Sequence, residues 1–174
     1  MKTLMTLSIV LGALAAIPGG AHADRQAGPS QVLGEVKFRF DSAALPANAP
    51  RLLDAAVRFA AAHPGHRIVL DAHCDPIGTS PYNVALAIRR AESVRAQLVA
   101  RGVPADQIVF AIYGKDGARR ASYADDRRVT LWPTREPLAA VIDHTLAGKG
   151  TAVTWNRPLT TAQVEAAPQP VASR

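Results

Sequence analysis

Alternation of apolar and polar residues predicts four β-strands in the middle of the chain. In the first, Val36, Phe38 and Phe40 share one face, and the second alternates with the same two-residue period. This period is typical of strands with one buried face. The strands are expected at residues 32–40, 67–74, 108–113 and 128–132.

Two amphipathic helices are expected between the first three strands. The first begins near Asn48, as a cap, and ends at Pro64-Gly65; the second begins at Ser80, its expected cap, and ends at Gly102. The order strand, helix, strand, helix, strand, strand predicts an α/β fold, or α+β sandwich, of two βαβ units. In this fold the helices pack on a mixed sheet.

The N-terminal segment has the pattern of an export signal. Lys2 supplies a positive charge, residues 4–17 are largely apolar, and Ala21-His22-Ala23 has the small-x-small form of a signal peptidase site. We expect residues 1–23 to be a signal peptide and residues 24–31 a flexible lead, so that the product reaches the periplasm. Loss of Lys2 would lower the formal net charge from +6 to +5.

The expected domain spans residues 32–133, and residues 134–174 form a C-terminal extension that is partly disordered. Within the extension, a helix is expected at residues 137–146 and a strand at 152–155. The apolar residues of this helix share one stripe. The pattern leaves two interpretations open, a helix that folds back onto its own domain or one that docks into a partner's groove. The stripe consists of Leu138, Val141, Ile142 and Leu146.

The most informative segment is residues 73–83, which joins the second strand to the long helix. Asp75 lies in this loop, and Arg90 lies in the helix, so we expect them to face each other across a small concave site. An anionic group opposite a cationic group suits a zwitterionic ligand. The alternative is that Asp75 and Arg90 form an ion pair with a purely structural role. No nucleophile, base and orienting group accompany them, so neither an enzyme, a metal site nor a cofactor is expected. The single cysteine, Cys74, falls on the apolar strand face and is expected to be buried.

An ordered set of short motifs resembles the OmpA-like peptidoglycan-binding domain family. Each motif alone is weak, but together they follow the family's order over about a hundred residues. Asp126 departs from the family, which usually has Asn there. No lipid-anchor cysteine follows the apolar N-terminal stretch. The motifs are Phe40-Asp41-Ser42, His73-Cys74-Asp75 with Gly78, Tyr82-Asn83, Arg89-Arg90-Ala91, Tyr113-Gly114-Lys115 and Arg127-Arg128-Val129.

The resemblance implies a ligand and a role for each site residue. The ligand is the diaminopimelate of the peptidoglycan stem peptide: Asp75 pairs with its ammonium and Arg90 grips its carboxylate through two parallel hydrogen bonds. Asp41 lines the same site, Arg128 supports it, and Asn83 braces the loop or forms the rim.

The implied function is a non-catalytic periplasmic module that binds peptidoglycan. The alternative is an adaptor subunit of an envelope secretion or conjugation complex, with residues 134–174 as the docking segment for a protein partner. The polyanions available to a basic exported protein are the carboxylates of the cell wall and anionic lipids, so nucleic acid is not an expected partner.

Overall fold

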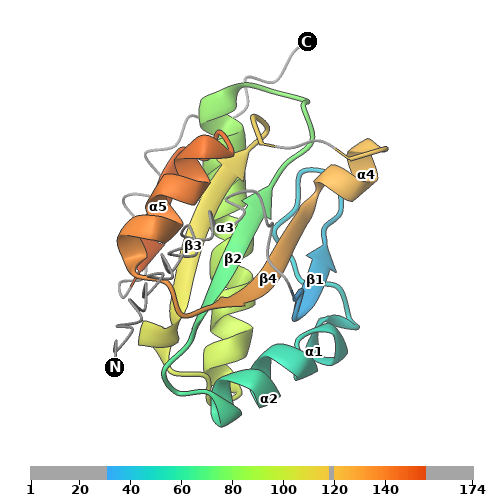
Figure 1. Cartoon of the computed structure of the whole chain (residues 1–174). Helices are drawn as coiled ribbons and strands as arrows, with labels where there is room; N and C mark the ends of the chain where they lie inside the picture. The colour runs from blue at the N-terminus through green and yellow to red at the C-terminus, as the bar shows by residue number, and fades with distance from the viewer. Residues whose placement is uncertain (1–30, 118–119, 156–174) are drawn as a thin grey trace, which may run out of the picture.

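The computed structural model describes residues 31–117 and 120–155, which form one sheet with helices on both of its faces (Figure 1). The strands are β1 (Gly34–Lys37), β2 (Arg67–His73), β3 (Ile108–Gly114), β4 (Arg128–Thr134) and β5 (Ala152–Trp155). The helices are α1 (Ala49–Leu52), α2 (Asp54–Ala62), α3 (Ser80–Ala100), α4 (Tyr123–Asp126) and α5 (Leu138–Ala147), with a short 3₁₀ helix at Ala105–Gln107. The expected signal peptide and the end of the extension lie outside the described residues.

The sheet is mixed, with the strand order β1-β4-β2-β3-β5. Strands β2 and β3 are parallel, whereas β4 runs antiparallel to both β1 and β2. The predicted α/β fold is therefore confirmed, but β4 separates the strands of the first βαβ unit. The carboxyl ends of β1, β2 and β3 meet the start of β4 at one end of the sheet, where the connecting loops gather (Figure 1).

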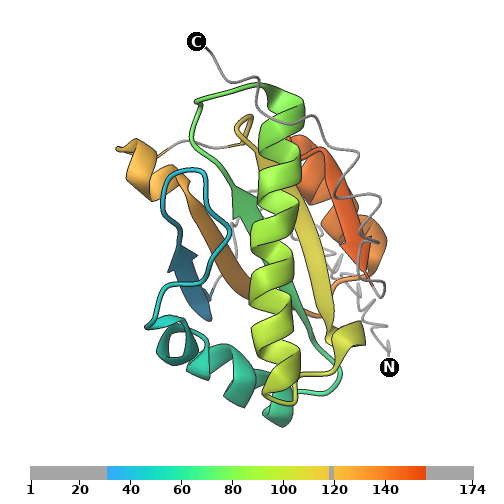
Figure 2. The same cartoon turned by 180° about the vertical axis from the view of Figure 1, so that it is seen from behind.

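The first face of the sheet is covered by α1, α2 and α3 (Figure 2). Ile68, Leu70 and Ala72 of β2 point into this core, as their two-residue spacing predicts, while Val69 points to the other face. The cap predicted at Ser80 was misplaced by one residue, whereas Asn48 is the N-cap of α1, as predicted. Thr79 Oγ1, not Ser80, accepts a hydrogen bond from Tyr82 N at the start of α3 (3.4 Å), and the Asn48 side chain makes no cap hydrogen bond.

The second face of the sheet is covered by α5 (Figure 1). Val141 of α5 is fully buried against residues of β2, β3 and β4, and β5 pairs with β3 as an additional edge strand. The sheet therefore includes a strand from beyond the expected domain boundary at residue 133. The helix that was expected at residues 137–146 exists and folds back onto its own domain. A cover is needed because the central strands are apolar on both faces; the residues beneath α5 are Val69, Val109, Ala111, Tyr113 and Trp132.

Replacing Val141 by alanine tests this packing. Because Val141 is 0% exposed, we expect the free energy of unfolding to fall by roughly 1.5–3 kcal/mol. Leu146→Ala is the matched control, since Leu146 lies on the same helix but is 60% exposed, and it should change stability by less than about 0.5 kcal/mol. Urea denaturation measures both, and equal effects would contradict the packing of α5 on the sheet.

Within residues 31–117 and 120–155, no helix combines the length and apolar character that crossing a membrane requires.

Candidate functional site

The candidate site is built from the loops at the carboxyl ends of β1 and β2 and the start of β4. Asp75 follows β2 and is buried, with one carboxylate oxygen accepting a hydrogen bond from Ile77 N (3.2 Å). The other oxygen accepts from Arg127 Nη1 at 3.1 Å in an ion pair. Arg127 also donates through Nε to Phe38 O (3.2 Å). Arg127 thus joins the end of β1 to the loop that carries the acid.

Arg90 lies behind this pair and is almost completely buried, with 1% of the residue exposed. Its guanidinium also lies 5.2 Å from the centre of the Phe38 ring. Burial lowers the pKa of Arg90, and the nearby Cys74 and Asp75 act in the opposite direction. Arg90 therefore holds the loop after β1 against the end of β2. Its hydrogen-bond acceptors are Ser42 O (2.9 Å), His73 O (3.1 Å), Arg39 O (3.2 Å) and Cys74 Sγ (3.3 Å).

The alternative of a structural ion pair between Asp75 and Arg90 is not what the structure shows. The two residues are neighbours, as predicted, but the ion-pair partner of Asp75 is Arg127. The Arg127 side chain is 19% exposed, whereas Arg90 is directed into the protein. Arg90 is recognisable in the sequence because it stands before an alanine in a short motif, but the burial of its donors depends on how two distant loops fold around it.

Asn83 and Cys74 brace the loop between β2 and α3. Asn83 is buried and donates through Nδ2 to the carbonyl oxygens of Ile77 (2.8 Å) and Thr79 (3.1 Å), which confirms the loop-bracing interpretation. The buried Cys74 thiol donates to Asn83 O (3.3 Å), and burial raises its pKa to about 11. Cys74 is therefore a neutral packing residue rather than a reactive thiolate.

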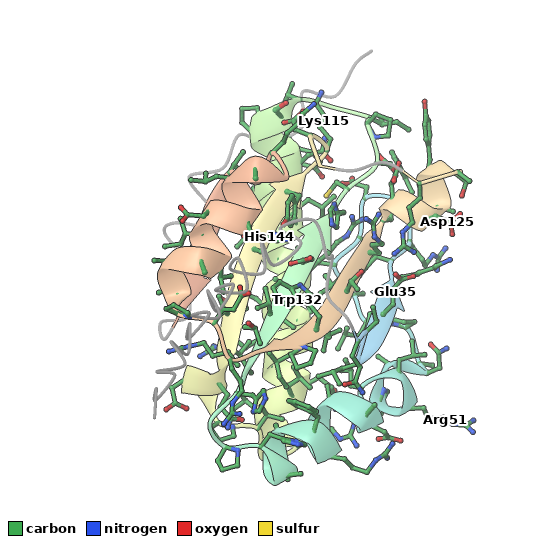
Figure 3. All side chains as sticks on the ribbon, in the orientation of Figure 1. Glu35, Arg51, Lys115, Asp125, Trp132 and His144 are labelled. Carbon is green, nitrogen blue, oxygen red and sulfur yellow. The ribbon has the colours of Figure 1, made fainter. Side chains whose placement is uncertain are left out.

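Lys115 braces the same loop from the other side. It extends from the loop after β3 at the end of the molecule that carries the site (Figure 3), and its Nζ donates to Gly78 O (2.7 Å). Gly78 has a φ of 90°, a left-handed conformation that glycine adopts without steric cost. The loop that carries Asp75 is thus held by hydrogen bonds from three sides.

Asp41 occupies the tip of the loop after β1 and is exposed. Its backbone has a φ of 50°, unusual for a residue with a side chain. The Tyr82 hydroxyl donates to the Asp41 carboxylate, which ties this loop to the first turn of α3. Asp41 is accessible to a ligand, and its expected place in the site stays a prediction.

Arg128 does not lie where the resemblance implied. Val129 is in the core beneath α3, so the preceding residue points to the opposite face of the sheet. There the buried Arg128 pairs with Asp126 (3.6 Å), the negative neighbour expected from the sequence. The arginine that contacts Asp75 is Arg127, one position earlier. Strand alternation sets Arg128 on the face opposite Val129, but it gives no direction for Arg127, which precedes β4.

Two titratable residues of β2 face the side of the sheet away from Arg90. Burial raises the pKa of Asp71 to about 7 and lowers that of His73 to about 3. His73 stacks on Tyr113, with ring centroids 4.6 Å apart, and is neutral at physiological pH. Among residues 31–117 and 120–155, no group of three or more His, Cys, Asp or Glu side chains is placed to hold a metal ion.

Comparison with known proteins places this arrangement in a family. The family model described as the OmpA family matches residues 37–130, more than half of the chain. The peptidoglycan-associated lipoprotein of Pasteurella multocida is 32% identical over 148 residues, which cover 75% of this chain and 99% of that protein.

Solved structures agree with the family assignment. The crystal structure of the peptidoglycan-associated lipoprotein from Burkholderia pseudomallei is 34% identical, with a TM-score of 0.52, over 58% of this chain and 90% of that one. The C-terminal domain of Helicobacter pylori MotB is 20% identical with a TM-score of 0.52, over 65% and 94% of the two chains, and shares the fold. The chain belongs to the OmpA family.

Proposed function

We propose that this protein is a non-catalytic module of the cell envelope that binds peptidoglycan. Two observations support the proposal: the chain belongs to the OmpA family, and its relatives include proteins named peptidoglycan-associated lipoproteins. The proposed ligand is the diaminopimelate of the stem peptide, whose free end carries an ammonium and a carboxylate on one carbon.

The observation that carries the ligand assignment is the ion pair between Asp75 and Arg127. It offers one anionic and one cationic group, 3.1 Å apart, at the loop end of the sheet. A ligand ammonium takes the place of Arg127 at Asp75, and the released guanidinium binds the ligand carboxylate. This exchange conserves the number of ion pairs, so that a zwitterion binds without leaving a charge unpaired.

The remaining predicted site residues have supporting roles in this proposal. Arg90 and Asn83 fix the two loops from behind, and Asp41 supplies a second carboxylate near the ammonium. Arg127 replaces Arg90 as the group that grips the carboxylate, because the Arg90 donors already bind three carbonyl oxygens and a sulfur atom. Arg127 has the planar geometry that suits a carboxylate.

A module that binds peptidoglycan acts outside the cytoplasmic membrane, and we place this protein in the periplasm, in association with the wall or the outer membrane. An envelope protein partner for residues 134–174 stays a prediction. The segment's helix does not favour it, because Val141 of α5 is buried against the sheet of its own domain.

Sedimentation with purified peptidoglycan sacculi tests the proposed function. The protein should pellet with sacculi that contain diaminopimelate, and free meso-diaminopimelate should release it. The matched control ligands are soluble stem tripeptides with diaminopimelate or with lysine at the third position. Inside a peptide the lysine side chain ends in an ammonium without a carboxylate, so the lysine tripeptide should release far less protein at the same concentration. Absence of pelleting would contradict peptidoglycan binding, and equal release by the lysine tripeptide would contradict recognition of the carboxylate.

A further inference from the structure

Large apolar side chains are exposed around the charged site although the backbone that carries them is held in place. Six large hydrophobic residues are exposed in the described part of the chain, and half of them, including both aromatic ones, lie in the loops after β1 and β2 or in α4. The three are Phe40 (58% exposed), Ile77 (49%) and Tyr123 (56%), called the apolar rim below.

Each member of the apolar rim lies within four residues of a charged residue of the site. The pairs in the sequence are Phe40 with Asp41, Ile77 with Asp75, and Tyr123 with Arg127. The rim therefore draws one side chain from each of three segments: the loop after β1, the loop after β2 and the helix α4 that precedes β4.

Hydrogen bonds hold the backbone at each of the three positions. Ile77 donates its N–H to Asp75 and accepts from Asn83. Phe40 lies between residues 39 and 42, whose carbonyl oxygens accept from Arg90. Tyr123 begins α4, whose capping residue Ser122 accepts from Asp125 N (3.2 Å).

An exposed apolar group on a fixed loop gains no burial within its own chain. Exposed apolar groups next to the charged residues of a polar site are typical of a surface that contacts a ligand. Scattered exposed apolar residues need no such explanation. Those elsewhere in the described chain are Val32, Val99 and Leu146.

We propose that the apolar rim binds the D-alanine residues that follow diaminopimelate in the stem peptide. This inference rests on the proposed function, because the covalent structure of the peptidoglycan stem peptide determines which of its groups lie against the rim. Asp75 and Arg127 hold the free charged end of diaminopimelate, and its three methylene groups lead outward from them. The D-alanine methyl groups are attached at the far end of this aliphatic chain, so they reach the exposed edge of the site where the rim lies.

The rim gives the protein a preference for longer stem peptides. Each buried methyl group contributes about 0.8 kcal/mol, so two D-alanine methyls correspond to an affinity gain of roughly tenfold. The protein should therefore bind a disaccharide-pentapeptide more tightly than a disaccharide-tripeptide that ends at diaminopimelate.

Titration calorimetry with these two soluble muropeptides tests the inference. Phe40→Ser and Tyr123→Ser should each reduce the preference for the pentapeptide, while the affinity for the tripeptide changes by less than about twofold. Leu146→Ser is the matched control: it removes an equally exposed apolar side chain from α5, outside the site loops, and should keep the full preference. Thermal melts show that each variant is folded.

The outcomes separate this inference from the proposed function. A wild-type protein that binds both muropeptides equally, or rim variants that keep the full preference, would overturn the role of the rim while tripeptide binding still supports the function. If the tripeptide does not bind at all, the proposed function itself fails, and the rim inference fails with it.

Discussion

Asp75→Ala is expected to abolish sedimentation of the protein with peptidoglycan sacculi. Asp75 is buried and is the acidic member of the ion pair with Arg127, so its loss leaves the ligand ammonium without a counter-charge. Removing one member of a buried, hydrogen-bonded charge pair costs about 2–5 kcal/mol, which is a loss of about 30- to 4,000-fold in affinity. Sedimentation over a range of sacculus concentrations measures the change.

Asp106→Ala is the matched control for this experiment. Asp106 is also an acid, but it is exposed in the short 3₁₀ helix before β3, at the opposite end of that strand from the site. Its replacement changes the net charge by the same amount and should leave binding intact. Undiminished sedimentation of Asp75→Ala would show that the acid does not hold the ligand.

Arg90→Ala is expected to damage the fold rather than binding alone. The side chain is 1% exposed and binds acceptors on two segments of the chain, the loop after β1 and the end of β2. Removing it leaves buried carbonyl oxygens without their donor and opens a cavity. We expect the free energy of unfolding to fall by about 3–5 kcal/mol, a large share of a typical domain's stability of about 5–15 kcal/mol. Urea denaturation measures this loss.

Arg127→Ala provides the contrast. It removes the ion-pair partner of the buried Asp75, but the Arg127 side chain is partly exposed, so stability should fall by about 1–3 kcal/mol, less than for Arg90→Ala, while sedimentation with sacculi is lost. If Arg90→Ala instead remains as stable as the wild type and only fails to bind, then Arg90 contacts the ligand directly and the assignment to Arg127 is wrong. Arg127→Lys should also bind weakly, because the planar fork is lost.

The sequence by itself determined the element order and the class of the fold. The period of two in residues 67–74 assigned Ile68 and Val69 to opposite faces, because side chains alternate along a strand. The long helix ended at Gly102 for an equally local reason, the left-handed conformation that glycine accepts there. These features depend on a few adjacent residues, so they can be recognised without a structure.

Pairing between distant strands was decided by the tertiary structure. Nothing local shows that β4 lies between β1 and β2, or that β5 pairs with β3. The apolar stripe of α5 was visible in the sequence, but a stripe specifies only that a helix needs a partner. The partner proved to be the second face of the sheet, which the central strands leave apolar.

The choice among the arginines likewise needed the tertiary structure. Arg90, Arg127 and Arg128 all belong to motifs seen in the sequence, and their charges are the same. Their roles differ because Arg90 is enclosed by two loops, Arg127 lies beside Asp75, and Arg128 follows it on a strand that turns its side chain to the other face. Charge, spacing and the alternation that sets Arg128 against Val129 are properties of the sequence, whereas the burial of Arg90 and the pairing of Arg127 with Asp75 arise only when distant segments pack together.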